Sequence, residues 1–388
     1  MTDTPLPTGD LVIDRELADV SASIRFLLDV TPVNLMAARA AFFETGRVPE
    51  FEYRPLEDDP DVTSARLAEI DLDAVEDEQL LPLFAAKKRE LELQLRMLRC
   101  RGTGEFLTLS TQLYGTVGPA LLGEAEALLA VVDPEAPDRP PALTAEEFAA
   151  RAEAELAHYR EHHIDLDVHV EVRADSSGVM VSNGDLLIAP TVVVAHDRVD
   201  SLLQHEIGTH VVTYVNGCHQ PLRLLGAGLA DYEETQEGLA VFAEFLAGGL
   251  TPGRLRQLAA RVIAVHEMIE GTDFGEIHAH LVDSGVSPVQ AFTITMRVFR
   301  SGGLTKDMVY LRGLRSIVNH VASGGSLGIL LLGKMSLADS PHIEALRDRG
   351  VLHEPLLTPR YLDRCDARDR LASIAPNTPL TEMIGATT

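Results

Sequence analysis

The feature that most constrains this chain is the segment HEIGTH, from His205 to His210. It lies in the run SLLQHEIGTHVVTYVNG, whose apolar spacing predicts a buried helix. Imidazole is a preferred ligand of zinc, and Glu206, directly after the first histidine, is placed to act on a metal-bound water. The segment therefore predicts a metal site on a helix, with two buried core histidines as the alternative.

The spacing of these histidines predicts an irregular helix. They are five residues apart, whereas the common zinc-binding helix places its histidines four apart. In an ideal α-helix this spacing turns the second side chain about 140° from the first. Both can bind one ion only if the helix widens there, as in a π-bulge. Gly208 eases such a departure, so we expect a bulge or distorted turn at Ile207 to Thr209.

A third metal ligand is expected in the next helical segment, DYEETQEGLAVFAEFL. A catalytic zinc site takes three protein ligands and keeps one position for water. Glu237 begins the buried face of this segment and is the expected ligand, with Glu234 and Glu244 as alternatives. We expect Glu244 instead to orient a ligating histidine. Gly238 and Ala240 are small enough to let this helix pack closely against the HEIGTH helix.

Three sequence blocks together resemble a known family. HEIGTH followed by TQEGLA resembles the QEGLA-motif family of zinc metallopeptidases, which includes the microtubule-associated tyrosine carboxypeptidases, and the chain looks like a bacterial-type member. The run MRVFRSGGLTKDMVYLRGL, Met296 to Leu314, is similar to the family's third recurrent block. The resemblance implies that His205, His210 and Glu237 bind Zn²⁺. It also implies that Glu206 is the catalytic base and that a C-terminal residue is removed from a peptide or protein.

Peptide hydrolysis at such a site needs two further groups. The developing oxyanion needs a donor, for which Tyr310, Tyr214 and Tyr232 are candidates, and we favour Tyr310 because it lies in the third block.

A free α-carboxylate needs a cation, and the arginine fork suits it. Four cations cluster in and around the Gly-Gly turn of the third block: Arg297, Arg300, Lys306 and Arg312. We expect at least two of them to line the substrate pocket; the alternative is pairing with surface acids.

The remaining sequence predicts a mostly helical protein. Residues 1–140 form a helical N-terminal region, and a proline-rich linker near residue 140 leads into a catalytic region, residues 141–388, with its zinc site at 205–237. Thr144 and Glu147 form a capping-box start. A hairpin with its turn at Asn183-Gly184 either offers an edge strand to an extended peptide or supports the metal helix. The expected fold is α+β, a mostly helical gluzincin-like metallopeptidase with one small antiparallel sheet beside the active-site helix.

Charge and composition bear on partners and location. The formal net charge of −26 disfavours nucleic acid, anionic membranes and acidic macromolecules such as tubulin tails. The three cysteines form no CxxC pair, which argues against a thiolate zinc site. The start of the chain has no basic segment followed by an apolar run, and no apolar stretch approaches the roughly 20 residues that span a bilayer. We therefore expect a cytoplasmic protein.

The leading hypothesis is a zinc metallopeptidase of the carboxypeptidase type, in which Glu206 assists attack by a zinc-bound water. One alternative is a zinc-bound regulatory or binding protein without peptidase turnover. Another is an aminopeptidase or endopeptidase that uses the same site. A different divalent ion in place of zinc is also open.

Overall fold

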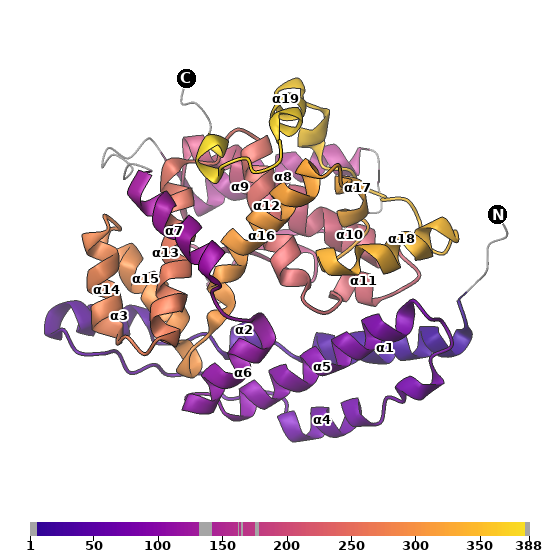
Figure 1. Ribbon diagram of the computed structural model, residues 1–388, viewed down its shortest axis with the longest axis horizontal. Helices are drawn as coiled ribbons and strands as arrows, with labels where there is room; N and C mark the ends of the chain where they lie inside the picture. The colour runs from indigo at the N-terminus through magenta and orange to yellow at the C-terminus, as the bar shows by residue number, and fades with distance from the viewer. Residues whose placement is uncertain (1–5, 132–141, 162, 164–165, 175–177, 385–388) are drawn as a thin grey trace. The chain divides into compact units, whose positions relative to one another are not determined.

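Helices form most of the structure, a computed structural model that describes residues 6–131, 142–161, 163, 166–174 and 178–384 (Figure 1). These residues form two compact units, and neither follows the chain continuously. The first unit contains the described residues of Met1–Pro7, Glu135–Thr251 and Gly313–Thr388, and the second those of Thr8–Pro134 and Pro252–Arg312. The boundary predicted between residues 140 and 141 lies outside the described residues.

The second unit is built from helices. They are α1 (Thr8–Ser23), α2 (Phe26–Asp29), α3 (Leu35–Thr45), α4 (Pro60–Ala68), α5 (Leu80–Arg99), α6 (Gly104–Tyr114), α7 (Pro119–Val131), α13 (Pro252–Ile269), α14 (Phe274–Asp283) and α15 (Pro288–Phe299), with short 3₁₀ turns at Leu72–Ala74, Arg300–Gly302 and Thr305–Met308. Helix α13 packs against α7 and α15. Phe42, Phe274, Phe292 and Met296 form an apolar cluster among α3, α14 and α15.

The first unit holds the HEIGTH and QEGLA segments. Its helices are α8 (Ala145–Arg160), α9 (Val199–His205), α10 (Val212–Cys218), α11 (Leu224–Ala227), α12 (Tyr232–Leu246), α17 (Leu327–Leu330), α18 (Ser340–Asp348) and α19 (Cys365–Ser373), and α16 (Val309–Ala322) contains the boundary between the units. Short 3₁₀ turns lie at His196–Arg198, Leu337–Asp339, Arg360–Asp363 and Leu380–Met383. Helix α12 packs along α9, which places the two motif segments side by side (Figure 1).

The strands of the first unit form two small sheets among the described residues. Strand β1 (Ala142–Thr144) pairs antiparallel with β5 (Val193–Ala195). The other sheet has the order β2 (Val170–Val172), β4 (Asp185–Ile188), β3 (Val179–Ser182), and β2 runs parallel to β4. The expectation of a single antiparallel sheet was therefore wrong. Alternation and turn residues predict the β3–β4 hairpin, but they do not say which edge a separate strand joins.

Several local predictions are confirmed. Thr144 and Glu147 form the capping box at the start of α8. Asn183 and Gly184 take the positive φ angles, 49° and 91°, that a tight hairpin turn requires. A Cβ on Gly184 would lie 2.5 Å from a ring carbon of Tyr214, so the hairpin turn packs on α10. Of the two roles predicted for the hairpin, this contact favours the second, which is to support the helix that carries the histidines. Among the described residues, no helix is long and apolar enough to cross a membrane.

Candidate metal centre

The HEIGTH helix widens where its histidine spacing requires it. Helix α9 ends at His205, a π-helical turn runs over Glu206–Val211, and α10 continues from Val212. Within this turn the Thr209 hydroxyl donates to the carbonyl of Gln204, five residues earlier, at 3.1 Å. The predicted bulge at Ile207 to Thr209 is confirmed. As a result, the rings of His205 and His210 have centroids only 5.2 Å apart.

Gly208 is also required by packing. A Cβ at this position would lie 2.7 Å from Oε1 of Gln204 and 3.2 Å from a ring carbon of Tyr361. Tyr361 is almost fully buried, so it has little room to move away. From the sequence, Gly208 was expected only to make the helix easier to distort. The contact with Tyr361, which lies far along the chain, is seen only in the fold.

The three expected ligands lie together in the first unit. Nitrogen atoms of His205 and His210 and a carboxylate oxygen of Glu237 all lie within 4.8 Å of one another. Oε2 of Glu237 is 3.8 Å from Nε2 of His205 and 3.7 Å from Nε2 of His210. Two ligands on one tetrahedral zinc ion are separated by roughly 3.4 Å, given bond lengths near 2.0–2.1 Å. The spacing of the donor atoms therefore fits one small metal ion.

The protonation state of His210 suits a metal ligand. Burial lowers the pKa of this imidazole to about 4, the charges of His205 and Lys334 act in the same direction, and Glu237 opposes them. His210 is therefore neutral at pH 7, and a neutral imidazole has a lone pair available for a metal.

The other ring nitrogen of His205 is held by a buried carboxylate. Oε1 of Glu244 lies 2.8 Å from Nδ1 of His205, and Oε2 accepts from Arg198 at 2.7 Å. Glu244 is fully buried. With Nδ1–H donating to Glu244, the lone pair of His205 is at Nε2, on the side of Glu237. The sequence singled out Glu244 for this role but did not indicate Arg198.

Glu206, the expected catalytic base, begins the π-helical turn directly after His205. It is buried, as are Ile207 and Thr209 beside it. A carboxylate next to a ligand on the same helix is the arrangement that general-base catalysis at a metal site requires.

The glycine of QEGLA contacts a different helix from the one expected. A Cβ on Gly238 would lie 2.2 Å from the carbonyl carbon of Gly313, and one on Gly313 would lie 2.1 Å from the carbonyl oxygen of Glu234. Gly238 therefore allows α12 to approach the backbone of α16. The expectation that it faces the HEIGTH helix was wrong because the sequence does not show which neighbour each helical face meets.

The third-block residues up to Arg312 belong to the second unit. Tyr310 lies under the Arg261 guanidinium, 4.7 Å from ring centre to Cζ, and Nζ of Lys306 is 5.7 Å from the same centre.

Arg297 donates two hydrogen bonds, of 2.5 and 2.7 Å, to buried Asp307. Arg300 donates to the Thr31 hydroxyl at 3.2 Å, and Arg312 to the Tyr114 carbonyl at 2.9 Å. These cations thus contact internal partners of their own unit.

Buried charge is concentrated around Asp307. Burial alone would raise the pKa of this carboxyl, but Arg297 and Arg261 outweigh it and hold the pKa well below its usual range. Burial lowers the pKa of Arg261 to about 10, and the same cause lowers that of Arg300 to about 10. The third block therefore contains an ionised, buried network.

Lys334 is a residue near the centre that the sequence did not indicate. Its Nζ lies 5.0 Å from the ring centre of Tyr214 and 5.8 Å from that of Tyr232, and its charge contributes to the low pKa of His210. It lies outside all three sequence blocks, so no motif or spacing pointed to it.

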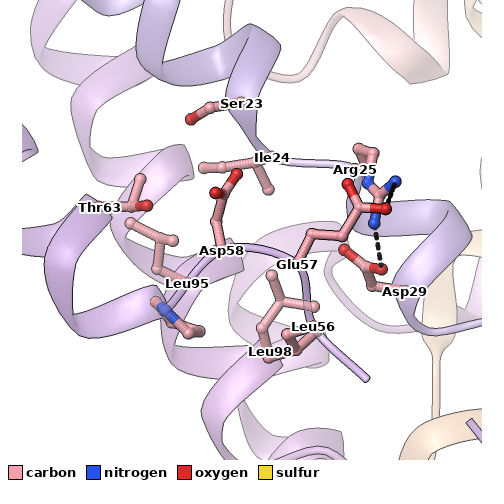
Figure 2. A pocket seen from close by; sticks show the side chains of 11 residues that line it. Ser23, Ile24, Arg25, Asp29, Leu56, Glu57, Asp58, Thr63, Leu95 and Leu98 are labelled. Atoms are coloured by element: carbon pink, nitrogen blue, oxygen red, sulfur yellow. Dashed lines mark ion pairs between the residues drawn. The ribbon is translucent and has the colours of Figure 1, made fainter. Parts of the chain in front are cut away.

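Two pockets have linings that do not include the three clustered residues. In the second unit, Arg25 forms ion pairs with Glu57 at 2.7 Å and with Asp29 at 3.7 Å beside a cavity of about 20 Å³, room for little more than a water (Figure 2). In the first unit, a cleft of about 400 Å³ includes Val199 and Leu203. At 100° per residue, Leu203 points about 160° and Val199 about 120° away from His205 around α9. Neither pocket is lined by the three clustered ligands.

The fold and the centre define a mostly helical α+β protein with two histidines and a glutamate grouped as a candidate metal site. A family model described as microtubule-associated tyrosine carboxypeptidase matches residues 40–377. The match spans most of the chain, and the protein belongs to this family.

Two individual proteins also show similarity, each over less of the chain than the family model. Microtubule-associated tyrosine carboxypeptidase 1 of Mus musculus is 29% identical over 185 residues, which cover 45% of this chain and 38% of the mouse protein. The chain thus matches less than half the length of that relative. The crystal structure of a putative lipoprotein from Colwellia psychrerythraea aligns with a TM-score of 0.47 and 12% identity, over 74% of this chain and 66% of that one. A likeness at this level supports no conclusion about fold or function.

Proposed function

We propose that this protein is a zinc-dependent carboxypeptidase with a gluzincin-like catalytic region. The observation that carries the proposal is the grouping of His205, His210 and Glu237 within 4.8 Å, beside the buried Glu206. Family membership suggests carboxypeptidase-type activity and supports the same conclusion. A metal site used only for structure would not need a buried glutamate directly after the first ligand.

The donor set fits zinc. Two imidazoles and one carboxylate are its usual ligands in catalytic sites, and three protein ligands leave a position for water or substrate. The neutral state of His210 and the hydrogen bond from His205 to Glu244 prepare both histidines for binding. When bound, the ion supplies a Lewis acid that polarises a peptide carbonyl and lowers the pKa of water.

The chain's own residues then move the proton and hold the substrate. Glu206 takes a proton from the attacking water and passes it to the leaving amine. We propose Tyr310 as the hydrogen-bond donor to the developing oxyanion, because two cations lie over its ring. We also propose that at least two of the third-block cations, Arg297, Arg300, Lys306 and Arg312, line the substrate pocket.

The proposed substrate is the C-terminus of a peptide or protein. The net charge of −26 works against long-range attraction of strongly acidic partners, so an acidic tubulin tail is not the proposed substrate. The same charge disfavours nucleic acid and anionic membranes.

The test follows release of terminal residues from a peptide library by mass spectrometry. Zinc-loaded wild type should release single C-terminal residues, and Glu206→Gln should retain zinc but lose most of the activity. Peptides amidated at the C-terminus should resist cleavage. Cleavage of amidated peptides would instead indicate an aminopeptidase or endopeptidase. If zinc stays bound and neither protein releases a residue, the regulatory alternative holds and the proposed function is wrong.

A further inference from the structure

One lysine lies beside both helices that carry the metal ligands. Nζ of Lys334 is 5.0 Å from the ring centre of Tyr214, which follows His210 by four residues on the same side of that helix. It is also 5.8 Å from the ring centre of Tyr232, the first residue of α12, which carries Glu237. Aromatic faces from two helices thus hold one ammonium beside the helices that carry the candidate ligands.

The backbone around Lys334 is held in place. Its N–H donates to the carbonyl of Leu225 at 2.7 Å, and its carbonyl accepts from the N–H of Leu229 at 2.9 Å. The preceding Gly333 packs so closely on this segment that a Cβ would lie 2.7 Å from the Leu225 oxygen. The buried Asn216 side chain of α10 fixes the carbonyl of Leu331 at 2.8 Å. The position of this cation is therefore set by the fold, although its side chain is long.

The Lys334 ammonium lies against the rings of Tyr214 and Tyr232, one from each helix that carries the ligands. The side chain is half-buried between rings, and in such a place a charge interacts more strongly than in water. A carboxypeptidase needs a cation near its metal because the terminal carboxylate lies close to the scissile bond.

We propose that Lys334 binds the terminal carboxylate of the peptide substrate, an assignment that rests on the proposed carboxypeptidase function. The other cation described beside the ligands, Arg198, donates to the buried Glu244 and serves to orient His205. In the third block, Arg297 is held by two hydrogen bonds to Asp307, and Arg312 by the Tyr114 carbonyl. Lys334 also interacts with other groups of the protein, so the assignment rests on its position against the rings of Tyr214 and Tyr232, beside both helices that carry the ligands.

The test measures binding, so it does not depend on turnover. In a zinc-loaded Glu206→Gln background, one peptide is titrated by calorimetry with a free C-terminal carboxylate and again as its amide. We expect the carboxylate form to bind about 10- to 100-fold more tightly, as for a charge-assisted hydrogen bond. Lys334→Met, which keeps an unbranched chain against the two rings, should reduce that ratio to near one.

Three further variants serve as comparisons. Lys334→Arg should keep most of the preference because it keeps the charge. Arg368→Gln removes an equal charge from an exposed position of the same unit, where the side chain is 61% exposed, and should leave the ratio unchanged. Arg312→Gln should also leave it unchanged. Zinc content and melting temperature of each variant report whether the centre is intact.

The outcomes separate this assignment from the proposed function. A preference that survives in Lys334→Met, disappears in Lys334→Arg, or depends on Arg312 would overturn the assignment, even if wild type releases C-terminal residues. Absence of any carboxylate preference in the parent protein would overturn it as well. A preference that depends on Lys334, in a protein that cleaves no peptide, would support the assignment and contradict the proposed function.

Discussion

At the scale of single residues, the candidate centre depends on groups that orient its ligands. Glu244 is fully buried and lies between the Arg198 guanidinium and Nδ1 of His205, at 2.7 and 2.8 Å. A buried carboxylate in this position fixes both the tautomer and the ring orientation of the ligand. Besides the three clustered residues, the candidate centre therefore includes the carboxylate of Glu244 and the guanidinium of Arg198.

Substitution of Glu244 should weaken metal binding without removing a ligand. We expect Glu244→Gln to lower zinc affinity by about 10- to 100-fold, measured by competition with a chelating dye. Glu234→Gln is the matched control. It removes a carboxylate from the same helix, and that carboxylate accepts a hydrogen bond from the Ser316 hydroxyl. Equal losses in the two variants would contradict the role given to Glu244.

The lowered pKa of His210 predicts a pH dependence of stability in the metal-free protein. Because the folded pKa of about 4 lies below the ordinary histidine value of 6.5, the unfolded chain binds this proton first on acidification. Stability from the neutral imidazole is complete above pH 6.5 and is lost as the pH falls towards 4, by up to about 3 kcal/mol. Urea unfolding at a series of pH values, with chelator present, measures this slope.

His210→Gln should flatten that slope. An unchanged slope in His210→Gln would show that other groups control the acid sensitivity.

At the scale of elements, two contacts between helical backbones and their neighbours shape the centre. The π-helical turn Glu206–Val211 brings the two histidines together, and Gly208 within it makes room for Tyr361. Gly238 lets α12 approach α16 at Gly313. Both glycines are needed because a side chain would meet atoms that cannot easily move.

Gly238→Ala should destabilise the protein by about 1–3 kcal/mol, because the new methyl group would meet the backbone of Gly313. Gly123→Ala is the matched control: it lies within α7, and a Cβ there meets nothing within 4 Å. That variant should be neutral or up to about 1 kcal/mol more stable, since alanine favours helix. Urea midpoints give the comparison, and a neutral Gly238→Ala would contradict the close approach.

At the scale of the whole molecule, what the sequence predicted was mainly local. Apolar spacing predicted a helix at the HEIGTH segment, Thr144 and Glu147 predicted the capping box of α8, and the five-residue histidine spacing predicted the π-helical turn. Partners distant in sequence were not predictable: Arg198, Lys334 and Tyr361 carry no motif, and nothing in the sequence indicates that β2 joins β4 in parallel. Such pairings arise only when the fold brings separate segments together.

The net charge of −26 also belongs to this scale. We expect it to repel acidic peptides at a distance, and salt screens that repulsion. For two peptides with the same C-terminal residue, kcat/KM for an acidic peptide should rise several-fold between about 0.05 and 0.5 M salt, while that for a neutral peptide changes little. Equal salt dependence for both peptides would argue against long-range repulsion.

The central claim is a single metal site shared by the HEIGTH and QEGLA helices. Metal analysis of purified wild type and Glu237→Ala, after equilibration with zinc and removal of excess ion, tests it most directly. The account predicts one zinc per wild-type chain and nearly none in Glu237→Ala. Unchanged zinc content in Glu237→Ala would contradict it and direct attention to Glu244 or Glu234 as the third ligand.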